Sequence, residues 1–210
     1  HRAITDPGAT RDLAASLAEG ARAHRDGLAR RLDTRAVVQF DEPLLAAAVG
    51  GRLAGVTAMT SVAAIDEASA TALLDVCVAA LGADVLVHGC TPGLPWNVVL
   101  RSGVTAVSVD AGALAAGDYD GMAEFVDSGR TVMLGVVPAT APQRLPSVEE
   151  VGAAAAAVTD RIGLPRSVLA ERIGISPACG LAGATPQWAC TAIELARKGA
   201  EALAGDPNAI

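Results

Sequence analysis

The sequence predicts an α/β protein that forms the later part of a (β/α)8, or TIM, barrel. Five short apolar segments alternate with longer segments of helical periodicity. Strands of almost continuous apolar character are typical of parallel sheets that are covered on both faces. No Gly-x-Gly-x-x-Gly motif follows any of these segments, which argues against a dinucleotide-binding fold. An open doubly wound sheet is the alternative that the pattern leaves, and the barrel is favoured.

The chain is shorter than a complete barrel of this class. It has 210 residues, whereas a (β/α)8 barrel usually needs about 250. We therefore expect one domain, residues 1–210, that holds about the last five βα units and lacks roughly three. The chain begins at His1 rather than at Met, in a polar segment, so we also expect an upstream piece.

Each expected element follows from a local pattern. In the first helix, Leu13, Leu17 and Leu28 recur at helical spacing between charged residues. A later helix opens with a capping box, in which Ser147 is the N-cap and Glu150 is the third helical residue. The expected strands are residues 36–40, 84–90, 104–109, 131–137 and 173–177. The expected helices are residues 9–32, 68–81, 95–102, 119–127, 148–161, 165–172 and 185–204, and residues 44–60 are expected to form a loop or a short helix.

The composition excludes several classes of function. Hydrophobic residues make up 51% of the chain and aromatic residues only 2%, which suits close packing of helices on a sheet but offers nothing for stacking nucleic-acid bases. The formal net charge is −7 and the Lys and Arg residues are scattered, so nucleic acid is not an expected partner. No apolar run approaches about 18 residues, so no membrane span is expected. The four cysteines do not form a disulfide framework, which favours a cytoplasmic protein.

Reactive side chains stand at the end of one expected strand after another. The first strand ends at Asp41, the second at His88 and Cys90, the third at Asp110 and the last at Cys179. In a parallel barrel these ends open onto one face, where barrel enzymes carry their active sites. One imidazole nitrogen, two sulfurs and one carboxylate oxygen form a plausible tetrahedral zinc site. We therefore predict His88, Cys90, Asp110 and Cys179 as zinc ligands.

Each of these residues also has an ordinary structural explanation. A single strand-end Cys is more often a small buried hydrophobe than a ligand, and Asp110 alone would commonly cap the next helix. His88 alone would be a hydrogen-bonded core histidine, and the Asp41-Glu42-Pro43 run would terminate a strand. The coincidence of all four candidate ligands at equivalent strand ends favours zinc. The remaining side chains of this type, Cys77, Cys190, Trp96 and Trp188, are expected in the packed interior.

Four motifs lie around these strand ends: Gln-Phe-Asp-Glu-Pro-Leu at residues 39–44, His-Gly-Cys at 88–90, Val-Ser-Val-Asp at 107–110 and Ser-Pro-Ala-Cys-Gly-Leu at 176–181. In order and spacing they resemble the C-terminal catalytic barrel of cobalamin-independent methionine synthase. The resemblance covers nearly the whole chain and implies strands four to eight of that barrel. The four motifs together are specific, whereas each one alone is weak.

The resemblance implies residue roles and an activity. It puts His88, Cys90 and Cys179 on three zinc-ligand positions, and Asp110 stands where the family has Glu. It also implies that Asp41 contacts the amino group of homocysteine. The implied enzyme is a 5-methyltetrahydropteroyltriglutamate–homocysteine S-methyltransferase, which methylates homocysteine from 5-methyltetrahydrofolate or its polyglutamate to give methionine. Zinc serves this reaction because it deprotonates a thiol whose free pKa is about 8.5.

One position departs from the family. The family has a His-Ser-Pro run after its seventh strand, and here Thr140 stands where that His, a candidate proton donor, would fall. Thr cannot act as a general acid near neutral pH. Two alternatives therefore stay open: a related barrel methyltransferase with a different thiol or with a corrinoid protein as methyl donor, and a non-catalytic relative that keeps only the fold. The sequence predicts no particular oligomeric state.

Overall fold

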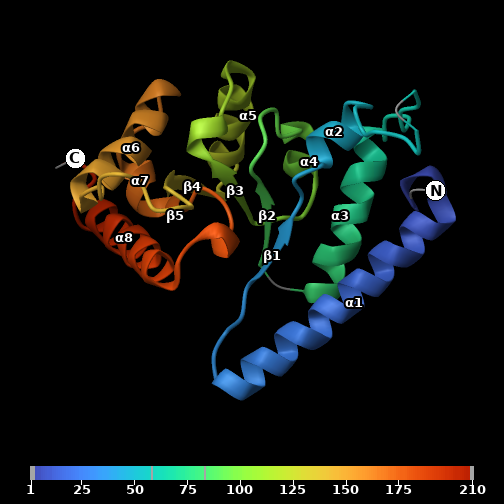
Figure 1. The fold of residues 1–210 in the computed structure, drawn as a ribbon, viewed down its shortest axis with the longest axis horizontal. Helices are drawn as coiled ribbons and strands as arrows, with labels where there is room; N and C mark the ends of the chain where they lie inside the picture. Colours follow the sequence, from blue (N-terminus) through green and yellow to red (C-terminus); the bar gives the residue numbers. More distant parts are fainter. Residues whose placement is uncertain (1–2, 58, 83, 209–210) are drawn as a thin grey trace. The chain divides into compact units, whose positions relative to one another are not determined.

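The computed structural model describes residues 3–57, 59–82 and 84–208 and divides into two compact units (Figure 1). The first unit comprises His1–His88 and Leu94–Ala106, and the second comprises Gly89–Gly93 and Val107–Ile210. The five strands are hydrogen-bonded neighbours in chain order, β1-β2-β3-β4-β5. The expected alternation of parallel strands with helices, as in part of a (β/α) barrel, is confirmed.

The first unit pairs two parallel strands and covers them with helices. Its elements are η1 (Ala3–Thr5), α1 (Pro7–Leu32), β1 (Val38–Asp41), α2 (Leu45–Val49), α3 (Glu67–Leu81), β2 (Val85–Gly89) and α4 (Trp96–Arg101). In the register of β1 and β2, Asp41 lies opposite His88. Paired residues of parallel strands point to the same face of the sheet, so the Asp41 and His88 side chains lie on one face. Phe40 points to the other face.

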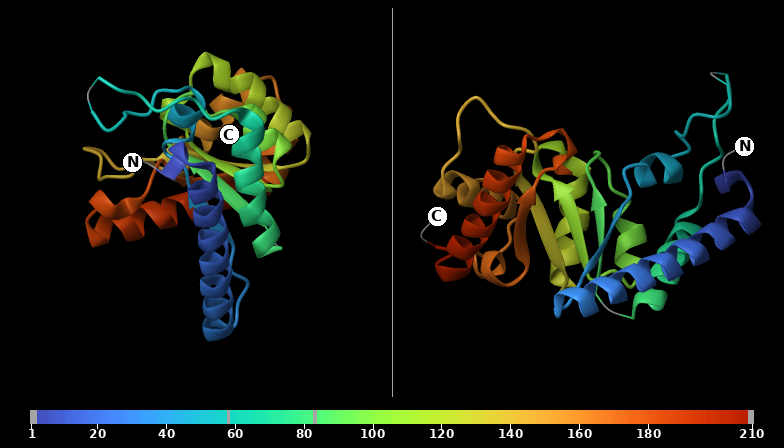
Figure 2. Two further views of the ribbon diagram at one scale, coloured as in Figure 1. Left: turned by 90° about the vertical axis from the view of Figure 1, so that its right-hand side faces the viewer. Right: turned by 60° about the horizontal axis from the view of Figure 1, so that its bottom comes forward.

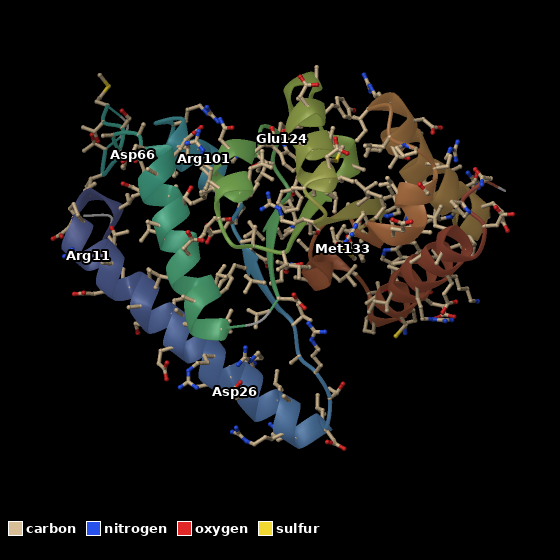
Figure 3. All side chains as sticks on the ribbon, turned by 180° about the vertical axis from the view of Figure 1, so that it is seen from behind. Arg11, Asp26, Asp66, Arg101, Glu124 and Met133 are labelled. Carbon is tan, nitrogen blue, oxygen red and sulfur yellow. The ribbon has the colours of Figure 1, made fainter. Side chains whose placement is uncertain are left out.

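Helices α1 and α3 pack against each other and begin at aspartate caps. The Asp6 side chain accepts hydrogen bonds from the N–H groups of the first turn of α1, and Asp66 does the same for α3. At the far end of α3, the Arg25 guanidinium of α1 donates a hydrogen bond to the carbonyl oxygen of Leu81. Arg25 also bonds Asp26, which is labelled in Figure 3 on the same helix. The hydrogen bond from Arg25 to Leu81 thus joins α1 to the end of α3.

The second unit carries the remaining strands and the longest helices of the C-terminal half. Its elements are β3 (Ala106–Asp110, whose first residue belongs to the first unit), η2 (Ala111–Ala113), α5 (Ala116–Asp127), β4 (Thr131–Val137), α6 (Val148–Arg161), α7 (Ser167–Glu171), β5 (Ile173–Pro177), η3 (Leu181–Gly183) and α8 (Pro186–Gly205). Figure 2 shows α8 (red) alongside β5, and the two are in contact. The predicted capping box of α6 is confirmed, because Ser147 and Glu150 exchange backbone-to-side-chain hydrogen bonds.

Most expected elements are confirmed to within a few residues, and the differences have local causes. The segment expected as a loop or a short helix contains α2, and the one-turn helices η1, η2 and η3 were not predicted because they are too short to show a period. Cys77, Trp96 and Trp188 are buried as expected. The expectation for Cys190 is wrong: it is exposed, because it lies on the face of α8 opposite the buried residues Ala192, Leu195 and Ala196.

None of the described helices is both long enough and apolar enough to cross a membrane.

The backbone of the second unit leaves no room for a side chain at Gly135. An added Cβ there would lie 2.6 Å from Ala178 Cα and 2.9 Å from the carbonyl oxygen of Val109. These atoms belong to the backbone that follows β5 and to β3, so neither can move aside alone. The register of β4 and β5 also shifts between Gly135 and Val137. The missing side chain therefore allows the turn after β5 to lie directly on β4.

Gly135→Ala should lower the free energy of unfolding by about 1–3 kcal/mol, the usual cost of overpacking a rigid interior. Urea unfolding at neutral pH measures this change. Gly180→Ala is the matched control, because an added Cβ at Gly180 has no atom within 4 Å and the backbone φ is −58°. Equal stability of the two variants would contradict the close packing described for Gly135.

Candidate metal centre

The thiols of Cys90 and Cys179, which are distant in sequence, lie next to each other in the second unit. Cys90 directly follows β2, and Cys179 follows β5 by two residues. Cys90 is half-buried and Cys179 is exposed. Burial raises the pKa of the Cys90 thiol, and a hydrogen bond with the Cys179 side chain and the negative charges of Cys179 and Asp110 raise it further. The Cys90 thiol therefore favours its protonated form more than an ordinary cysteine does, unless a cation stabilises the thiolate.

His88 supplies a nitrogen next to this pair. It lies two residues before Cys90 on the same extended segment, so both side chains point to one face. The imidazole is buried, with 6% of the residue exposed. One ligand atom from each of His88, Cys90 and Cys179 lies within 4.8 Å of the other two. His88 is the last residue of the first unit before the chain passes into the second unit at Gly89.

Asp118, which no motif in the sequence indicated as functional, holds the turn that carries Cys90. Gly93, three residues further on, has a φ of +76° and donates its N–H to Asp118 Oδ2 at 3.3 Å. Asp118 lies in the first turn of α5 and is 2% exposed. A carboxyl group at the third helical position is a capping signal, and the sequence shows this signal at Asp118. The sequence does not show that the same carboxyl group also accepts a hydrogen bond from Gly93.

The turn that carries Cys179 is held by backbone contacts. Ala178 donates its N–H to the carbonyl oxygen of Val137 at 2.8 Å, which continues the pairing with β4 past the end of β5. Trp188, near the start of α8, donates its indole N–H to the carbonyl oxygen of Pro138 at 3.1 Å. The chain on both sides of Cys179 is therefore bonded to the end of β4.

Asp110 lies at the end of β3 but outside the three-residue group. Its carboxyl oxygen Oδ1 accepts a hydrogen bond from Gly112 N at 2.8 Å, so it caps η2. This is the structural role that the sequence left open beside metal binding. Its negative charge still contributes to the raised pKa of Cys90. The ligand role of Asp110 therefore stays a prediction.

The side chains of Asp41 and Glu42 have different environments: Asp41 is exposed, and Glu42 lines a cavity. Asp41 is exposed and accepts a hydrogen bond from Gln39 Nε2 at 2.8 Å. The Glu42 backbone N–H donates to the carbonyl oxygen of His88 at 2.8 Å, while its side chain lines a cavity of about 280 Å³ with Phe40 and Cys77. Burial, and then the charge of Asp41, raises the pKa of Glu42. Glu42 thus belongs to the helix-covered side of the sheet, as a supporting residue would.

The loop after β4 leaves Thr140 exposed. Its hydroxyl does not titrate near neutral pH, so the position offers no general acid.

The donor set suits zinc on chemical grounds. Two thiols and one imidazole are the ligands that structural and catalytic zinc sites use, and a catalytic site of this kind has three protein ligands and a position for substrate. Hard cations such as Mg²⁺ prefer oxygen ligands, which this group lacks. The three side chains therefore fit a soft cation with one exchangeable position.

The family comparison agrees with the motifs. The family model described as the cobalamin-independent synthase catalytic domain matches residues 1–202. No curated protein matches the chain at a significant level. The family match covers both thiol-bearing turns and supports a methyltransferase-type enzyme of methionine biosynthesis. The resemblance that the four motifs predicted is confirmed, and the chain belongs to the family of cobalamin-independent synthase catalytic domains.

Proposed function

We propose that this protein is a zinc-dependent methyltransferase that converts homocysteine to methionine with a methyl-folate as donor. The observation that supports this most directly is the meeting of the Cys90, Cys179 and His88 ligand atoms within 4.8 Å. Family membership supplies the reaction class. We propose further that residues 1–210 are the C-terminal portion of the family's barrel, with β1 to β5 as its strands four to eight.

In this proposal the protein side chains divide the work by position. His88, Cys90 and Cys179 hold zinc, and Asp110 is the fourth ligand or stands beside the exchangeable position. Bound zinc would lower the pKa of the substrate thiol, so that a thiolate is available at neutral pH. Asp41, on the same face of the sheet as His88, binds the ammonium group of homocysteine and orients the thiol.

Thr140 favours a second candidate for the donor. N5 of a methyl-folate is a poor leaving group and needs a proton during transfer, which Thr140 cannot provide. A methyl group on a corrinoid leaves without protonation, because the electron pair of the carbon–cobalt bond remains on cobalt. The thiol site is the same in both candidates, and only the donor differs.

The donor and the thiol are tested together by measuring methionine formed from homocysteine with 5-methyltetrahydrofolate triglutamate or with methylcobalamin. We expect product with one donor, and about a tenfold preference for homocysteine over 4-mercaptobutanoate, which lacks the amino group; this preference corresponds to one charge-assisted contact. Asp41→Asn should remove most of that preference. Absence of product with both donors, in zinc-loaded protein, would refute the proposed activity.

Cys90→Ser and Cys179→Ser should each lose zinc during dialysis that leaves about one zinc per chain in the unchanged protein, because a hydroxyl is a much poorer soft ligand than a thiolate. Metal content is measured by atomic emission. Cys190→Ser is the matched control, since Cys190 is exposed on α8. Stoichiometric zinc in both site variants would place the metal elsewhere.

The raised pKa of Cys90 predicts its reactivity in metal-free protein. Alkylation requires the thiolate, so the rate at Cys90 should rise with pH around a midpoint above the 8.5 or so of an ordinary thiol. Asp110→Asn removes one of the negative charges that raise this pKa, so it should move the midpoint downward, though burial keeps it raised. Mass spectrometry of the Cys90 peptide after timed iodoacetamide labelling gives the profile. A midpoint at or below the ordinary value would contradict the described surroundings.

A further inference from the structure

We propose that Asp118 is a positioning residue that fixes the turn carrying Cys90 and thereby sets the affinity of the thiol site for zinc. The inference rests on the proposed function for the identity of the metal, and on hydrogen bonds within the second unit for the role of Asp118. Asp118 is the only acidic residue that is fully buried in the described part of the chain. Such burial is unfavourable for a carboxyl group unless hydrogen bonds compensate it.

A single oxygen of Asp118 joins two segments of the chain. Oδ2 accepts the N–H of Ala115 at 2.9 Å and the N–H of Gly93 at 3.3 Å. The first bond is local and caps α5, three residues away. The second bond crosses 25 residues of sequence and reaches the turn after β2. Asp118 therefore fixes the turn after β2 relative to the start of α5.

The turn is short enough for this bond to control the thiol. Cys90 and Gly93 are separated by Thr91 and Pro92 alone, and the ring of Pro92 restricts its own φ. Strand β2 fixes the chain before Cys90, and Asp118 fixes it at Gly93. Loss of the bond from Gly93 to Asp118 would remove this restraint on the chain that follows Cys90. Residues that orient metal ligands from outside the coordination sphere typically change metal affinity by about 10–100-fold.

A purely structural role for Asp118 makes a different prediction. If the carboxyl group only caps α5, its loss lowers the stability of the fold and leaves the zinc affinity of the folded protein unchanged. The zinc affinity at a temperature where every variant is folded therefore separates the two roles. Asp75 provides a matched control, because its Oδ1 accepts the N–H of Gly103 at 2.8 Å, a bond of the same chemistry in the first unit.

The experiment compares Asp118→Ala, Asp118→Asn and Asp75→Ala by competition for zinc with a chromophoric chelator and by the absorption spectrum of bound Co²⁺. We expect Asp118→Ala to bind zinc at least tenfold more weakly and to alter the thiolate-to-cobalt band. Asp118→Asn should stay within about threefold, because one amide oxygen can accept both hydrogen bonds. Asp75→Ala should match the unchanged protein. Folded Asp118→Ala with unchanged zinc affinity would overturn the proposal.

If Asp118→Ala does not fold, Asp118→Glu takes its place. Glu is the preferred capping-box residue at this helical position, so it keeps the cap of α5, while the extra methylene moves the oxygen relative to Gly93. The expected result is again weaker zinc binding, with Asp118→Asn as the rescuing variant. Unchanged affinity in Asp118→Glu would overturn the proposal in the same way.

A metal-free measurement keeps this test separate from the proposed function. In protein carrying Cys190→Ser, the equilibrium with oxidised and reduced glutathione reports how readily Cys90 and Cys179 form a disulfide, with two glutathione thiols as the other product. The equilibrium constant gives the effective concentration of one thiol near the other. Asp118→Ala should lower this effective concentration severalfold, since the Cys90 turn loses an anchor. If the unchanged protein binds no zinc, the proposed function fails, and the glutathione equilibrium alone decides the role of Asp118: no change refutes it.

Discussion

Parallel pairing of the strands is the constraint on which the rest of this structure depends. Because neighbouring strands run in the same direction, their carboxyl ends lie at the same edge of the sheet. This arrangement lets His88 and Cys90 at the end of β2 meet Cys179 after β5, although about ninety residues of sequence separate the two thiols. The helices that connect the strands serve the same constraint, because a parallel crossover needs a long connection.

The meeting of two thiols has an electrostatic consequence. Burial, the neighbouring thiol and the charge of Asp110 all act against the thiolate of Cys90, so its pKa lies above that of an ordinary cysteine. A bound divalent cation would stabilise the thiolate by its charge, so metal binding would release the proton. The preference for a soft cation comes from the donors themselves, two sulfurs and one imidazole nitrogen.

The two thiol-bearing turns are held by different contacts. A backbone hydrogen bond and the close approach at Gly135 hold the Cys179 turn to the end of β4, whereas the buried carboxyl group of Asp118 bonds the Cys90 turn. Asp110 lies at the end of β3, and Thr140 lies in the loop after β4. Differences at such positions alter the chemistry of a barrel enzyme without altering its packing.

Most of the local structure could be predicted from the sequence, which also suggested the residues of the candidate metal site. Apolar runs, caps and turn residues predicted the strands and most helices, and the family motifs at residues 39–44, 88–90, 107–110 and 176–181 named the ligands that the fold was expected to gather. It did not indicate Asp118, because a capping carboxyl group looks the same whether or not it reaches a distant turn. It also misplaced Cys190, because the helical period gives a face without saying which face is covered. The folded arrangement is needed to say which side chains meet, because contacts between residues distant in sequence depend on how whole elements pack and not on local preference.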